Sequence, residues 1–148
     1  MKRLLAPLFL ALFAWAEGWL EVVPERVEFG TVEEGKLSKP KKIQIKNIHS
    51  KDIVFGSVNI AGRDFLDFRI GKDLCSYTIL KPGATCEVEI FFQPRPLPRK
   101  KEKEEKKPRF VKKEGLFVVP LSELPDLDRT LKVAVPITGT ALSEEKKD

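Results

Sequence analysis

Residues 80–94, LKPGATCEVEIFFQP, decide the fold. A Pro-Gly pair near the start of this stretch is typical of a turn, and apolar and charged residues alternate after it. The apolar positions of one parity are Cys86, Val88, Ile90 and Phe92. Glutamates occupy the two positions between the first three of them. Because successive side chains of a strand point to opposite faces, this pattern predicts a strand with one buried face.

The same period of two recurs along most of the chain. The further strands that it predicts lie at 26–29, 42–46, 53–60, 66–70, 116–119 and 131–137. Glycines and prolines separate these segments, and no stretch of a dozen residues shows the 3.6-residue period of a helix. Seven to eight short strands with regular turns predict an all-β fold, a β-sandwich. Pro136 lacks an N–H group and therefore predicts that the last strand lies at a sheet edge.

The first sixteen residues have the features of a signal peptide. Lys2 and Arg3 precede an apolar run, and Ala14-Trp15-Ala16 matches the small-x-small pattern that precedes signal-peptidase cleavage. We expect cleavage between Ala16 and Glu17 and a periplasmic or secreted mature protein. The apolar run is too short to span a bilayer, and no later segment could do so. The predicted organisation is a signal peptide at 1–16, a sandwich domain at 17–142 and a charged tail at 143–148.

Composition restricts the kinds of site that the chain can build. Its 148 residues allow one domain and contain one His, one Tyr and two Cys. Sites that need several imidazoles or thiolates are therefore nearly excluded. Asn and Gln are scarce while Lys and Glu abound, which is a bias reported for hyperthermophile proteins.

Export determines how the two cysteines are interpreted. In an oxidising compartment Cys75 and Cys86, with no CxxC spacing and no nearby His, predict one structural disulfide. A redox-active pair is the alternative, but it requires a group that stabilises a thiolate.

Several short motifs occur in an order that resembles a known module. They are Pro24-x-x-x-x-Phe29-Gly30-x-Val32-x-x-Gly35, Asn47 after a strand, Cys75, Leu80-x-Pro82-Gly83-x-x-Cys86-x-Val88-x-Ile90-x-Phe92-x-Pro94, and Ile137-x-Gly139. Together they resemble the ASH (abnormal spindle and Hydin) module, which is similar to choice-of-anchor D repeats and to the major sperm protein fold. The resemblance spans about 24–140 and implies an immunoglobulin-like sandwich used for binding, with no catalytic residues to carry over.

The chain departs from that module in a charged insertion at 95–114. Its cations are Arg95, Arg99, Lys100, Lys101, Lys103, Lys106, Lys107, Arg109, Lys112 and Lys113. Four glutamates accompany them, so the insertion carries +6 and the rest of the mature chain −3. One interpretation is a long, flexible charged hairpin tip that tolerates length. The other is a basic arm that contacts an anionic surface, polymer, nucleic acid or acidic protein.

No catalytic constellation emerges from the sequence. His49 lies in an expected turn, where a lone histidine is usually solvated, and Asp64 and Asp67 lack an acid/base partner. No GxSxG, P-loop or HExxH motif occurs, so we expect no enzyme activity, cofactor or metal.

The sequence thus predicts an exported binding or structural module that scaffolds an assembly through protein contacts. One alternative is a single-domain periplasmic chaperone that lends a sheet edge to a subunit. The other is binding of nucleic acid or another anionic polymer through the basic arm.

Overall fold

The structure is a computed structural model that describes residues 18–98 and 107–144. The strands are β1 (Leu20–Val23), β2 (Val27–Glu33), β3 (Lys41–Asn47), β4 (Ile53–Phe55), β5 (Asn59–Ala61), β6 (Phe68–Asp73), β7 (Ile79–Leu80), β8 (Thr85–Phe92), β9 (Arg109–Glu123) and β10 (Thr130–Ser143). One short 3₁₀ helix, η2 (Phe65–Asp67), precedes β6.

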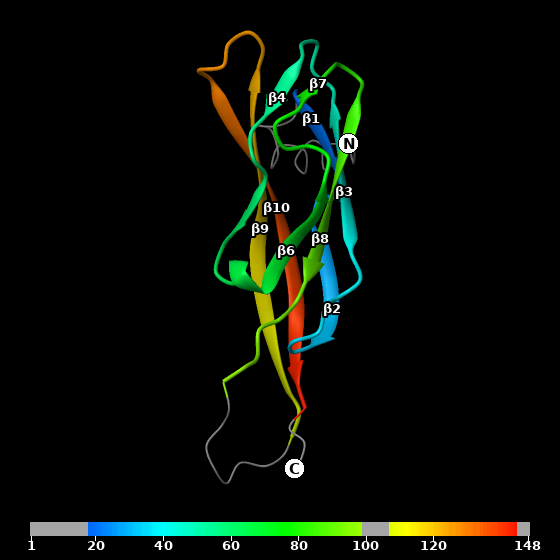
Figure 1. The fold of residues 1–148 in the computed structure, drawn as a ribbon, viewed down its shortest axis with the longest axis vertical. Helices are drawn as coiled ribbons and strands as arrows, with labels where there is room; N and C mark the ends of the chain where they lie inside the picture. Colours follow the sequence, from blue (N-terminus) through cyan, green and yellow to red (C-terminus); the bar gives the residue numbers. More distant parts are fainter. Residues whose placement is uncertain (1–17, 99–106, 145–148) are drawn as a thin grey trace, which may run out of the picture.

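The strands form two sheets packed as a sandwich, which confirms the predicted fold class (Figure 1). One sheet has the order β1-β3-β8-β6, and the other has the order β2-β10-β9-β4-β7, with β5 also paired to β9. The chain changes sheets repeatedly, and the connections from β1 to β2 and from β5 through β6 to β7 join the edges of the two sheets. These changes give the molecule two narrow sides, each covered by a crossing segment.

The alternation that defines β8 builds the core as expected. Val88, Ile90 and Phe92 are fully buried and face Phe117 and Ile137 of the opposite sheet. Glu87 and Glu89, which have the opposite parity, remain partly exposed. Apolar side chains of both inner sheet faces therefore supply the main stabilisation of the fold.

Two motif residues have clear structural roles. A Cβ at Gly139 would overlap the Phe92 ring, so the close approach of that ring requires glycine. Asn47 is fully buried, donates through Nδ2 to the carbonyl oxygens of Leu80 and Lys51, and accepts the N–H of His49. Asn47 therefore links the end of β3 to the turn at 48–51 and to the end of β7.

The predicted strand bounds differ from the observed ones, most of all in three segments. Segment 53–60 is two strands, β4 and β5, because the chain leaves the ladder at Gly56 and returns at Asn59. Residues 65–67 form η2, and β6 begins only at Phe68. In the third segment, β9 begins at Arg109 rather than at 116 and pairs with β10 from Arg109 to Ser122.

The prediction that Pro136 marks an edge strand was also wrong for the strand as a whole. β10 lies between β9 and β2, with antiparallel pairing to the first and parallel pairing to the second. Pairing with β2 begins only at Ile137, so Pro136 stands at the point where β10 gains its second neighbour. A missing N–H is tolerated there because residues 130–136 pair only with β9 among the described strands.

Candidate binding surfaces

The two predicted disulfide partners are bonded. Cys75 and Cys86 have Cα atoms 5.4 Å apart, and both side chains are buried. The bond joins β8 to the segment that crosses from β6 to β7. Both cysteines of the chain are used in this bond, and neither is free.

Asp73 organises the turn that carries Cys75. Its Oδ1 accepts the N–H groups of Cys75 and Ser76, each at 2.9 Å, and its Oδ2 accepts the Ser76 hydroxyl at 2.6 Å. Burial alone would raise the pKa of Asp73, but these hydrogen bonds hold the pKa below its usual range. Beyond them, Tyr77 adopts a left-handed backbone with φ of 59° while 77% of its surface stays exposed. The turn therefore presents an aromatic side chain on a constrained backbone.

A buried carboxylate holds the beginning of the charged insertion. Asp67 is fully buried, and its Oδ1 accepts the Arg95 backbone N–H at 2.7 Å and Arg95 Nε at 3.1 Å. Its Oδ2 lies 3.3 Å from Arg95 Nη2 and 3.4 Å from Lys113 Nζ. Burial alone would raise the pKa of Asp67, but the hydrogen bonds of Arg95 and the charge of Lys113 hold that pKa below its usual range. One carboxylate thus ties both ends of the insertion to the sandwich.

Other contacts extend this anchored region. Leu97 is buried, and its N–H donates to Glu34 Oε1 at 2.6 Å. The second oxygen of Glu34 accepts the Ser143 hydroxyl at 3.1 Å. Arg109 Nη1 donates to the Pro98 carbonyl at 2.6 Å. Residues 94–98 are therefore held by η2, by the turn after β2 and by the start of β9, instead of forming part of a free loop.

The structure separates the ten predicted binding cations into different groups. Arg95 and Lys113 neutralise Asp67, Arg109 binds a backbone carbonyl, and Lys112 is exposed on β9. Lys107 is also exposed. Outside the described residues lie Arg99, Lys100, Lys101, Lys103 and Lys106. The structure therefore does not assemble the ten residues into one described binding site.

Two glutamates near the end of β2 differ in their contacts with the charged insertion. Glu34 contacts Leu97 directly, and Glu33 forms an ion pair with Lys36 at 3.8 Å. Glu33 ends β2 and Glu34 follows it, and this end of β2 lies beside the end of β10 (Figure 1). The sequence could not indicate this contact because β2 and the insertion are more than sixty residues apart.

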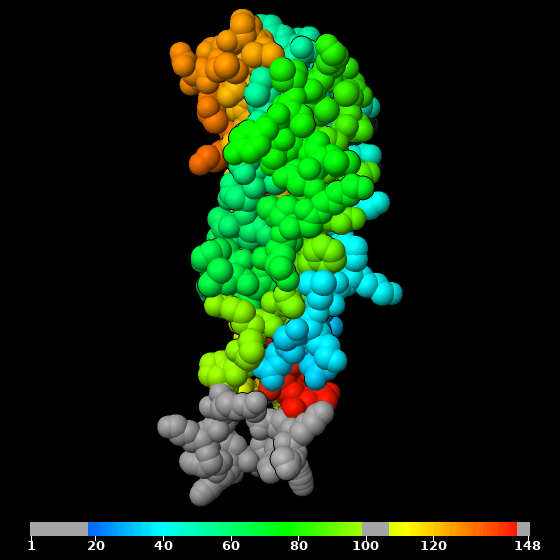
Figure 2. Space-filling model, viewed as in Figure 1, coloured from blue at the N-terminus to red at the C-terminus, as the bar shows by residue number. Residues whose placement is uncertain are grey.

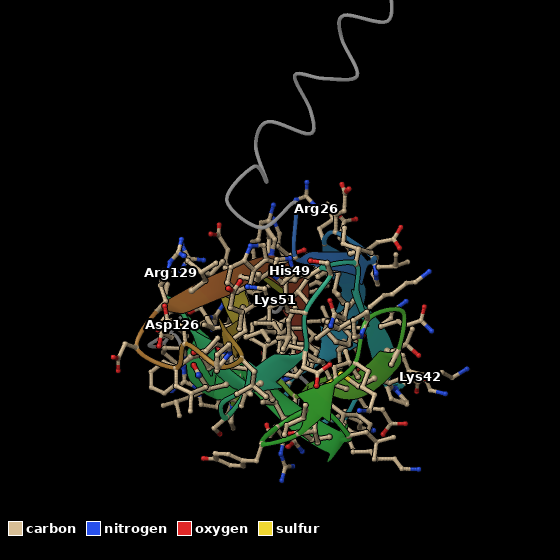
Figure 3. All side chains as sticks on the ribbon, turned by 90° about the horizontal axis from the view of Figure 1, so that it is seen from above. Arg26, Lys42, His49, Lys51, Asp126 and Arg129 are labelled. Atoms are coloured by element: carbon tan, nitrogen blue, oxygen red, sulfur yellow. A yellow bond between two sulfur atoms is a disulfide. The ribbon has the colours of Figure 1, made fainter. Side chains whose placement is uncertain are left out.

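The far end of the sandwich carries a cluster that the sequence did not indicate. The His49 ring stacks on Trp19 with centroids 4.8 Å apart, and its Nε2 lies 2.8 Å from Glu123 Oε1. Lys51 Nζ lies 3.6 Å from the other Glu123 oxygen. The His49 hydrogen bond, more than the Lys51 charge, holds the pKa of Glu123 below its usual range. Figure 3 shows His49 and Lys51 toward the middle of this end, whereas Lys42 extends outward.

His49 is therefore not the solvated turn residue that its sequence context favours. Its exposed side-chain fraction is 19%, and it connects the start of β1 to the end of β9. Among the described residues, no group of three His, Cys, Asp or Glu side chains could hold a metal ion. No helix in the described ranges 18–98 and 107–144 is long and apolar enough to cross a membrane.

Comparison with known proteins identifies the fold. No protein-family model and no curated protein sequence matches the chain. The ASH/PapD-like domain of human CEP192 (PapD-like domain 7) superposes with a TM-score of 0.52 and 16% identity, covering 88% of both chains. The C. elegans major sperm protein family member WR4 gives 0.51 and 12%, covering 84% of this chain and 99% of that chain.

Two bacterial proteins share the fold over part of their length. The periplasmic chaperone SfaE gives a TM-score of 0.53 and 11% identity, covering 86% of this chain and 58% of that chain. The secreted serine protease VesC from Vibrio cholerae gives 0.50 and 16%, but the match covers only 23% of that protease. The chain therefore has the immunoglobulin-like fold shared by ASH, PapD-like and major sperm protein domains.

Proposed function

We propose that the protein is an exported, non-enzymatic binding module that joins a periplasmic or cell-surface assembly through protein contacts. One observation carries this proposal. Eleven large apolar side chains stay exposed on the described part of a domain whose buried polar side-chain atoms are all hydrogen-bonded within the fold. Exposed apolar side chains favour contact with a partner protein.

Export is supported by two independent features. The disulfide fits an oxidising compartment, and the leader has the charge and length of a signal peptide. The leader lies outside the described residues, so its cleavage after Ala16 remains part of the proposal.

The experiment is chemical crosslinking in intact cells that produce the full-length chain with a C-terminal tag. We expect the mature mass of the protein cleaved after Ala16, together with adducts to a protein partner. A purified chain that retains its leader would contradict export. Adducts to nucleic acid or polysaccharide alone would contradict the protein-binding proposal and favour the basic arm at 95–114.

One observation supports strand addition, as in the chaperone alternative, as a second candidate. Residues 130–136 of β10 pair only with β9 among the described strands, so one edge is open. Ala134 has the same parity as Pro136, so Ala134→Pro would remove an N–H from the same side of the strand. Loss of the adduct in this variant would support strand addition, and an unchanged adduct would exclude it.

A further inference from the structure

We infer that the narrow side formed by residues 57–81 is the docking surface, and that it binds a protein surface with an apolar recess surrounded by carboxylates. The inference rests on the proposed binding function and names the surface that performs it. We call residues 57–81 the crossover surface, because this segment runs from β5 through β6 to β7 and passes from one sheet to the other. In Figure 2 it forms the green upper and middle part of the visible face.

Apolar exposure is concentrated on the crossover surface. Five of the eleven large apolar side chains that stay exposed in the described chain belong to it: Phe65, Leu66, Leu74, Tyr77 and Ile79. Their exposed fractions range from 47% to 77%. A concentration of aromatic and aliphatic groups on one side is typical of a protein interface.

The acidic and the basic side chains of the crossover surface differ in their contacts. Its three carboxylates are engaged: Asp64 binds Arg63 and the Glu114 N–H, Asp67 binds Arg95 and Lys113, and Asp73 binds its own turn. All four cations of the segment are exposed, namely Arg63, Arg69, Lys72 and Lys81. Neither Lys72 nor Lys81 forms an ion pair with a residue that the structure describes, and Arg69 binds only the neutral Gln93.

This distribution determines the chemistry of the partner. An apolar surface bordered by cations is complementary to an apolar recess bordered by Asp and Glu side chains. A second copy docked through the same surface would bring these cations together, which like-charge repulsion disfavours. The partner is therefore a different, acidic protein.

The backbone around Tyr77 is fixed before a partner binds, which favours this part of the crossover surface as the centre of the interface. The Cys75–Cys86 bond, the three hydrogen bonds of Asp73 and the Tyr77 N–H donated to Gly56 at 3.3 Å fix the backbone before any partner binds. An aromatic side chain on a fixed backbone loses little conformational entropy on binding and is a common energetic centre of interfaces.

The crossover surface is poorly suited to pairing with a strand of the partner. A register shift between Ile70 and Asp73 interrupts β6, and β7 has only two residues. Irregular and very short edge strands are devices that discourage pairing with another strand. Side chains, rather than the backbone, are therefore what the crossover surface presents.

The test places a photoreactive benzoylphenylalanine at Leu66 or Tyr77 of the full-length chain in its own cells. Matched controls carry it at Val23 or Leu37, which are 53% and 51% exposed and lie outside the crossover surface. We expect a protein adduct from the first pair at a yield at least about fivefold above the controls, with Asp or Glu residues in the crosslinked partner peptide. Adducts to lipid, to a second copy, or to a peptide without carboxylates would overturn the inference.

The captured partner is then purified and its affinity measured. The variant L74S/Y77A should weaken binding at least about tenfold, while V23S/L37S should change it less than about twofold. Unchanged melting temperatures of both variants establish that the fold is retained. Equal affinity of L74S/Y77A and wild type would overturn the inference.

The outcomes separate the two proposals. A protein adduct obtained only from Val23 or Leu37 overturns the crossover surface but leaves the binding module in place. Absence of a protein adduct from all four positions contradicts both.

Discussion

The charged insertion and the crossover surface show how differently charge can be used in one domain. In the sequence the insertion is the conspicuous region, because it carries +6, whereas 57–81 carries four cations and three carboxylates and looks unremarkable. In the structure, two insertion cations neutralise Asp67 of the crossover surface. The exposed cations of 57–81 therefore lose one of their nearby counter-ions to the insertion. Counting charges along the chain locates the basic residues but does not show which of them remain available.

The strongest test of the link between the two regions is Asp67→Ala. This change leaves Arg95 and the largely buried Lys113 without their shared anion, so we expect a loss of about 4 kcal/mol in the free energy of unfolding. Urea denaturation followed by circular dichroism measures it. Asp126→Ala, which removes an exposed carboxylate, is the matched control. A loss below about 1 kcal/mol would mean that the insertion is not anchored as described.

The disulfide tests the rigidity of the crossover surface. Replacing Cys75 and Cys86 by Ser should lower the free energy of unfolding by about 3 kcal/mol, because the bond closes a loop in the unfolded chain. Free-thiol labelling of the denatured, unreduced wild type should detect essentially no thiol. Two reactive thiols per chain would refute the bond.

Lowering the pH should reduce the free energy of unfolding by protonating two carboxylates, Asp67, which binds the insertion, and Asp73 in the crossover surface. Asp67 and Asp73 have pKa values below their usual range in the folded protein, so the unfolded chain binds protons first as the pH falls. Their contribution is therefore complete above the unfolded carboxyl pKa of about 4 and is lost as the pH falls through the lower folded values. Urea midpoints measured from pH 6 to pH 2.5 should decline, and Asp67→Asn should decline less steeply. An identical slope in the variant would contradict the role of Asp67.

Shortening the insertion should have the smallest effect, provided that its anchored ends are kept. Replacing 99–106 by a short Gly/Ser linker should change the free energy of unfolding by less than about 0.6 kcal/mol, because loop-closure entropy varies slowly with length. Removing all of 95–114 should be much more damaging, since this deletes Arg95, Leu97 and the first six residues of β9. Equal melting temperatures of the two deletions would contradict the anchoring contacts.

The sequence predicted the parts of the fold that depend on local pattern. Alternation in 86–92 and 131–137 placed the two central strands β8 and β10, and two cysteines in a chain expected to be exported predicted the disulfide. The start of β9 was missed because Lys112, Lys113 and Glu114 obscure its alternation. Lys113 nevertheless points inward, where Asp67 compensates its charge.

The surfaces could not be predicted because they depend on contacts between distant residues. Glu123 reaches His49 across 74 positions, and Glu34 reaches Leu97 across 63. Neither pair forms a local motif. Likewise, the sequence does not show that Lys72 and Lys81 lack an ion-pair partner among the described residues. That becomes clear only from the structure, in which the acids of the same segment bind other groups.

The central claim is that the crossover surface, and not the charged insertion, contacts the partner. It is tested most directly by measuring partner association for two charge reversals, R69E/K72E/K81E on the crossover surface and K100E/K101E/K103E/K106E in the insertion. The account predicts at least about tenfold slower association for the first variant and less than about twofold for the second, although the second changes the net charge more. The opposite order would contradict the account and assign recognition to the insertion.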